Sequence, residues 1–89
     1  MIEVEKKDKD EFKVIVTYKG VNTEHNVSLD DAYYQRLTGG EITKEELIKR
    51  SFEFLLMRES NQSILSSFDL SVINRYFPEY EDEISLKPV

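Results

Sequence analysis

Apolar and polar side chains alternate through the first third of the chain. Residues 11–18 show this most clearly, because every second residue is apolar and would point to the same face of a strand. Residues 2–5 and 23–29 alternate in the same way, and Gly20 suits a tight turn between the second and third of these segments. The pattern predicts an antiparallel hairpin or three-stranded meander over about residues 2–29, packed on one face.

The spacing of apolar residues becomes helical later in the chain. Residues 43–59 predict a central helix, with Thr43 and Glu46 as a capping box at its start. Its apolar arc is wider than the stripe of an ordinary surface helix, so we expect a sheet on one side of it and later helices on the other. Met57 falls on the charged side. The arc consists of Leu47, Ile48, Ser51, Phe52, Phe54, Leu55 and Leu56.

Shorter helical segments are predicted on either side of the central helix. The first begins at Ser28 or Asp30, either of which can cap it, and ends at Gly39, which adopts the left-handed conformation without steric cost. Ser60-Asn61 can cap a short helical turn that contains Ile64, Leu65 and Phe68, and Asp69 is expected to cap a last helix. The apolar face of that last helix, ahead of Pro78, would consist of Leu70, Ile73, Tyr76 and Phe77.

These elements together predict an α+β fold in a single domain over residues 1–89. The strands occupy about residues 2–29, the helices about residues 30–78, and an acidic tail residues 79–89. A chain of 89 residues can bury one small core. A deep enzyme cleft is harder to build at this size.

Charge and composition narrow the range of functions. The chain has 12 Lys and Arg residues against 18 Asp and Glu, a formal net charge of −6. Such a surface repels nucleic-acid phosphates and anionic lipid headgroups, so we expect neither nucleic acid nor membrane as a partner. The lack of cysteine excludes disulfides and thiolate metal sites. Without an apolar signal segment near its start, the sequence predicts a cytoplasmic protein.

Few residues offer catalytic or metal chemistry. His25 is the only histidine, and its alternation with Val27 is typical of a partly buried strand residue. A weak hydrolase that uses His25 and nearby acids is the third functional hypothesis. Asp8-Lys9-Asp10 starts like a calcium loop but lacks the glycine at the sixth position, and Asp30-Asp31 suits helix capping better than a divalent cation. We therefore expect no catalytic residue, no cofactor and no metal site.

A DNA-binding motif supplies the alternative function. The strand over residues 23–29, followed by two helices separated at Gly39, resembles the order of elements in a ribbon-helix-helix regulator. That family points basic or polar side chains of the strand into the major groove, whereas residues 23–29 contain no Lys or Arg and include Glu24. Residues 64–76 resemble a helix-turn-helix, but Arg75 is the only base in the expected recognition helix.

The C-terminal half resembles a group of small uncharacterised bacterial proteins. The similarity covers residues 52–59, 63–65 and 68–81, and its most distinctive pieces are Phe68-Asp69-Leu70 and Tyr76-Phe77-Pro78-Glu79-Tyr80. The group has no known activity. The resemblance therefore implies a small bacterial protein of the cytoplasm and no particular chemistry.

The favoured function is a non-enzymatic protein–protein interaction module with a basic partner. Its contact surface is predicted at the C-terminal segment, because tyrosine is a common interface anchor and acids speed encounter with a basic partner. Tyr80 is expected to be at least half exposed, whereas Tyr76 and Phe77 are expected in the core. In the competing interpretation the segment only covers the core. The candidate contact residues are Arg75, Glu79, Tyr80, Glu81, Asp82 and Glu83.

Overall fold

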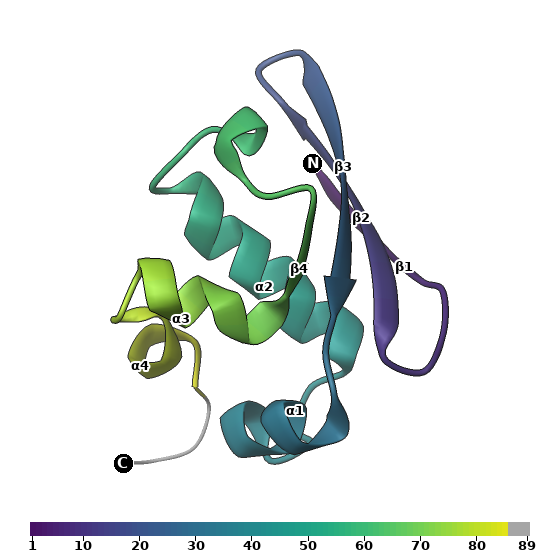
Figure 1. The fold of residues 1–89 in the computed structure, drawn as a ribbon, viewed down its shortest axis with the longest axis vertical. Coiled ribbons are helices and arrows are strands. Elements are labelled where there is room, and N and C mark those ends of the chain that lie inside the picture. Colours follow the sequence, from purple (N-terminus) through teal and green to yellow (C-terminus); the bar gives the residue numbers. More distant parts are fainter. Residues whose placement is uncertain (86–89) are drawn as a thin grey trace.

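A four-stranded sheet forms one layer of the molecule, and all the helices lie on one of its faces (Figure 1). This computed structural model describes residues 1–85. The first three strands pair antiparallel in sequence order, which confirms the predicted α+β class and its meander. These strands are β1 (Ile2–Lys6), β2 (Glu11–Tyr18) and β3 (Val21–Ser28).

The meander follows from the alternation of β2 and from a two-residue turn. Val14 and Val16 are fully buried under the helices, while Lys13 on the opposite face binds Glu24 of β3 at 2.9 Å. Lys19 and Gly20 join β2 to β3 with φ angles of 51° and 80°. Two successive positive φ angles match the right-handed twist of a hairpin, and glycine adopts such an angle without steric cost.

A fourth strand, β4 (Ser67–Asp69), pairs parallel to β3 and was not predicted. The helical turn expected to contain Ile64, Leu65 and Phe68 is wrong, because the 3₁₀ helix η1 (Asn61–Ser63) ends before Ile64 and Phe68 lies in β4. A three-residue strand is too short to show a period of two, and β3 offers an open edge for hydrogen bonding. The Asn26 N–H donates to the Ser66 carbonyl at 2.8 Å. The helix-turn-helix interpretation therefore fails, because residues 64–66 are not helical and a strand stands where that motif would need its turn.

Two capped helices follow the meander, α1 (Asp31–Thr38) and α2 (Lys44–Leu56). The Asp30 carboxylate accepts the Tyr33 N–H at 2.8 Å, and Gly39 ends α1 with φ 64°. The Thr43 hydroxyl accepts the Glu46 N–H at 3.0 Å. The Glu46 carboxylate does not complete the capping box, because it binds the Arg50 guanidinium at 3.1 Å.

The core lies between the sheet and α2, and it confirms the predicted phase of that helix. Phe52 is fully buried, Leu55 is 3% exposed and Met57 is 84% exposed. Short helices then close the far side of α2. They are η2 (Leu70–Val72), α3 (Ile73–Tyr76) and α4 (Tyr80–Ile84).

Helix α4 lies inside the segment predicted as an acidic tail. Glu81, Asp82 and Glu83 occupy its first turn, where negative charge is favourable at the positive end of the helix dipole. Helix formation and acidic composition are therefore compatible here. Within residues 1–85, no helix combines the length and the apolar content needed to cross a lipid bilayer.

Candidate functional site

The predicted contact residue Tyr80 is buried in the core, so the expectation that it is half exposed is wrong. Its side chain is 0% exposed and its ring packs against Phe54, with 5.2 Å between the ring centroids. The Ser51 hydroxyl donates to the Leu47 carbonyl at 2.7 Å, so the Tyr80 hydroxyl donates to Ser51 at 2.6 Å. Tyr80 thus fastens α4 to α2.

Most acids around Tyr80 bind other parts of the same chain. Glu81 accepts hydrogen bonds from the Tyr33 hydroxyl at 2.8 Å and from the Arg36 guanidinium at 2.6 Å, both on α1. The Arg58 guanidinium binds Glu79 at 3.3 Å and Glu83 at 2.9 Å. These carboxylates are therefore not a free rim for a partner.

Burial and the acceptor Glu81 together raise the pKa of the Tyr33 hydroxyl. Tyr33 therefore stays a hydrogen-bond donor throughout the ordinary pH range. The remaining two predicted contact residues, Arg75 and Asp82, are exposed. Neither has an ion-pair partner within residues 1–85.

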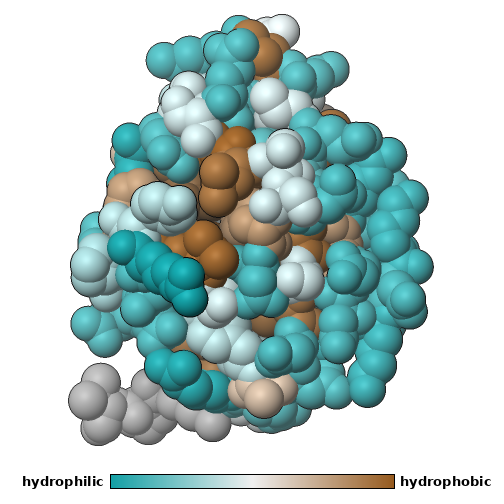
Figure 2. All heavy atoms as spheres, in the orientation of Figure 1, coloured by the Kyte–Doolittle hydropathy of each residue, from teal (hydrophilic) through white to brown (hydrophobic). Residues whose placement is uncertain are grey.

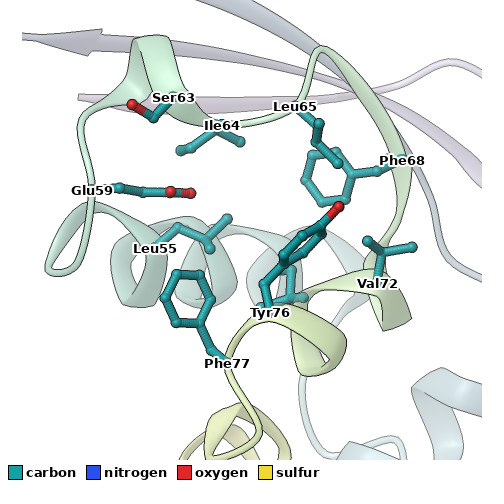
Figure 3. A pocket seen from close by; sticks show the side chains of 10 residues that line it. Leu55, Glu59, Ser63, Ile64, Leu65, Phe68, Val72, Tyr76 and Phe77 are labelled. Carbon is teal, nitrogen blue, oxygen red and sulfur yellow. The ribbon is translucent and has the colours of Figure 1, made fainter.

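An apolar groove opens between α3, the end of α2 and the segment that leads into β4. Apolar side chains gather near the centre of this face in Figure 2, and Figure 3 shows the groove from close by. Its volume is about 300 Å³. The groove is lined by Leu55, Glu59, Ser63, Ile64, Leu65, Phe68, Val72, Ile73, Tyr76 and Phe77.

Two large apolar residues of the groove are exposed at its rim. Leu65 is 47% exposed and Tyr76 is 66% exposed, whereas Leu55 and Ile73 beneath them are buried. The expectation that Tyr76 belongs to the core is therefore wrong. Its position was extrapolated along one regular helix, but the chain forms a 3₁₀ turn and then only four α-helical residues. Tyr76 lies at the margin of the apolar face, where no element of residues 1–85 covers it.

Glu59 places a carboxylate in this apolar groove. Its side chain points between Leu55 and Ile64 in Figure 3, and burial raises the pKa of its carboxyl. In the part of the chain that the structure describes, this carboxylate has no hydrogen-bond or ion-pair partner. The neighbouring Arg58 does not neutralise it. The central carbon of the Arg58 guanidinium lies 3.6 Å from the centroid of the Phe54 ring, and the guanidinium binds Glu83 of α4.

Sequence reasoning did not identify Glu59, although a signal for it exists. Four residues separate Glu59 from Leu55, so a continued helix turns by only about 40° between them. An acid at that spacing falls on the arc of buried residues instead of on the charged side. The helix ends at Leu56, but the chain keeps a helical bond there, with the Glu59 N–H donating to the Leu55 carbonyl at 2.9 Å.

His25 supports the rim of the groove without lining it. The ring is 2% exposed, more buried than the partial burial expected from the sequence. A carbonyl can only accept, so His25 Nδ1 donates to Leu65 O at 2.7 Å, while Nε2 lies 2.8 Å from the Thr23 hydroxyl. Both ring nitrogens thus have partners. Across residues 1–85, no group of three or more His, Cys, Asp or Glu residues is placed to hold a metal ion.

Comparisons with protein-family models, with curated proteins and with solved structures give no significant match to this chain. The resemblance of the C-terminal half to small bacterial proteins stays a prediction. The chemistry of the groove is therefore the main guide to function.

Proposed function

We propose that this protein is a non-enzymatic protein–protein interaction module whose contact surface is the groove between α2, β4 and α3. The main support for this proposal is that Leu65 and Tyr76 are exposed beside a concave apolar surface. An exposed apolar patch with polar surroundings is typical of a binding site, and tyrosine is a favoured interface anchor.

The contacts of the C-terminal segment support the groove as the contact surface in preference to that segment. Tyr80 binds Ser51 of α2, Glu81 binds α1, and both Glu79 and Glu83 bind Arg58, which lies two residues beyond the end of α2. A partner at α4 would have to break these contacts first. At the groove, by contrast, a partner meets apolar side chains that face solvent already.

The chemistry of the groove favours binding over catalysis. A hydrolytic site needs a nucleophile within hydrogen-bond reach of a base. Among residues 1–85, Glu59 is the only carboxylate that lines the groove, and His25 lies outside the lining with both nitrogens engaged. The ribbon-helix-helix alternative is not favoured, because β3 pairs with β2 along one edge and with β4 over residues 26–28 of the other.

A comparative capture experiment tests the proposal. The wild-type chain and the variants Tyr76→Ser and Leu65→Ser are immobilised and exposed to a lysate of the native host. Met57→Ser is the matched control, since Met57 is exposed and apolar but does not line the groove. All four proteins should melt at similar temperatures because the three side chains are exposed.

The expected result is one protein that is captured by the wild type and by Met57→Ser but lost from both groove variants. Equal capture by all four proteins would place the contact elsewhere. Failure of the wild type to retain any protein specifically would count against the interaction function itself.

A further inference from the structure

We infer that the segment of the partner protein that fills this groove carries a lysine or arginine next to an aliphatic or aromatic side chain, and that its cation binds Glu59. The inference rests on the proposed function, because it names the chemistry of the partner at the same groove. It also gives the predicted basic partner a specific contact.

Within residues 1–85, Glu59 differs from the other charged groups whose pKa is shifted, because burial alone acts on Glu59 and the others also have hydrogen-bond partners. Lys44 is the clearest comparison, because its side chain is only 13% exposed and its ammonium binds Asp10 at 2.9 Å and Asp31 at 2.7 Å. Asp69 is likewise satisfied by the hydroxyls of Ser28 and Ser71. The Glu59 carboxylate is partly shielded from water but has no hydrogen-bond or ion-pair partner within residues 1–85.

A cation from another protein would give the Glu59 carboxylate the partner that it lacks within residues 1–85. A carboxylate that is shielded from water and unpaired is unfavourable, whereas a charge-assisted hydrogen bond in the same place is among the stronger polar contacts. The carboxylate points into the groove between Leu55 and Ile64 (Figure 3). A basic side chain could reach it only if its neighbour, or its own aliphatic stem, lay on the apolar walls.

The net charge of the chain distinguishes between the possible occupants of the groove. Each copy of this chain carries a net charge of −6, so long-range repulsion disfavours a second copy. The same charge attracts a basic segment of another protein and raises its rate of encounter. Charge complementarity at both long and short range therefore selects a basic partner.

Peptide selection tests the inference without knowledge of the natural partner. A displayed library of random peptides is selected against the wild type, Glu59→Gln and Glu59→Lys. Glu53→Lys is the matched control, because Glu53 is an exposed acid on the same helix and does not line the groove. Peptides from the wild-type selection should combine a large apolar residue with Lys or Arg.

Each charge variant has a distinct expected result. Selection on Glu59→Gln should keep the apolar residue and lose the basic one, and selection on Glu59→Lys should enrich Asp or Glu instead. Glu53→Lys should select the same peptides as the wild type. A wild-type-selected peptide should bind Glu59→Gln about 10-fold more weakly, as expected for a charged hydrogen bond.

The outcomes separate this inference from the proposed function. If selected peptides lose binding on Tyr76→Ser but show no basic preference, the groove binds protein and the inference about Glu59 is wrong. If no peptide is selected, or if Tyr76→Ser leaves binding intact, the proposed function fails as well. Reversible self-association that Tyr76→Ser abolishes would assign the groove to a second copy and overturn the inference.

Discussion

Tyr76 and Tyr80 stand four residues apart, on either side of Pro78, and occupy opposite environments. Tyr80 is 0% exposed and donates a hydrogen bond into the core, whereas Tyr76 is 66% exposed at the rim of a groove. Three of the four acids around Tyr80 bind α1 or Arg58, which lies just after α2, and Asp82 is exposed. Beside Tyr76, the Glu59 carboxylate has no partner within residues 1–85. The two regions have similar composition but differ in whether their polar groups are satisfied.

This difference shows which observation separates a structural surface from a binding surface. Tyrosine and acidic residues occur in both, so composition alone does not distinguish them. Satisfaction of polar groups does, because a folded chain leaves few partly buried charges without a partner. In this molecule that criterion favours the groove over α4 as the proposed contact surface.

The largest expected effect is a contrast in stability between the two tyrosines. Tyr80→Ala should lower the free energy of unfolding by about 3–5 kcal/mol, the usual range for removing a buried aromatic ring. Tyr76→Ala should change it by no more than about 0.5 kcal/mol, as for exposed positions. Urea unfolding followed by circular dichroism measures both. Similar losses for the two variants would mean that α4 and the groove are not distinct.

The floor of the groove belongs to the core, and a second pair of variants tests this. Leu55→Ala should cost about 2–5 kcal/mol because it leaves a cavity beneath the groove. Met57→Ala, two residues later, should cost far less because that side chain is exposed. The same denaturant measurement applies. Equal destabilisation would show that the helical phase of α2 is not as described.

The hydroxyl of Tyr80 is expected to contribute less to the free energy of unfolding than its ring does. Tyr80→Phe keeps the packing against Phe54 and removes the hydrogen bond to Ser51, so it should cost about 1 kcal/mol. Tyr76→Phe is the matched control and should be close to neutral, since no intramolecular hydrogen bond of the Tyr76 hydroxyl is present within residues 1–85. A neutral Tyr80→Phe would indicate that the Ser51 contact adds nothing to α4 docking.

The smallest expected effect is a pH dependence of stability that comes from Glu59. Burial raises its folded-state pKa above the ordinary glutamate value of about 4.5, so the folded state holds this proton more tightly than the unfolded state. The favourable contribution is complete below the ordinary pKa and is lost as pH rises through the folded-state pKa. Relative to the wild type, Glu59→Gln should therefore become more stable as pH rises over that window.

Denaturant midpoints measured across a pH series give this difference, with Glu53→Gln as the exposed control. A stability difference that stays constant with pH would show that the Glu59 carboxyl is fully hydrated. The pH dependence from Asp69 runs in the opposite direction. Burial opposes ionisation of the Asp69 carboxyl, but hydrogen bonds from Ser71 and Ser28 outweigh burial and hold its pKa below the ordinary value. Its contribution is lost as pH falls.

Local patterns were sufficient to predict the meander, α1 and α2. The alternation of β2, the caps at Asp30 and Thr43, and the stop at Gly39 all depend on residues within a few positions of one another. The positions of Leu55 and Met57 followed from the same short-range periodicity. These elements required no knowledge of what each would pack against.

The candidate site could not be predicted, because it depends on contacts between distant residues. Tyr80 is buried because its ring packs against Phe54 and its hydroxyl binds Ser51, and both partners lie on α2, far earlier in the chain. The groove exists because β4 joins the sheet at β3, and three residues carry no readable strand period. Glu59 was discoverable from its spacing to Leu55, but its isolation from other charges depends on where Arg58 turns.

The parallel pairing of β3 with β4 also determines when the groove can form during folding. Ser28 and Asp69, which this pairing joins, are 41 residues apart, whereas a two-residue turn joins β2 to β3. Closing the longer loop costs more chain entropy, so β4 should dock after the hairpin and detach before it. Native-state hydrogen exchange should show weaker protection for the amides of β4 than for those of β2, and equal protection would mean that the sheet opens as one unit. One wall of the groove is thus a late and separable part of an otherwise local fold.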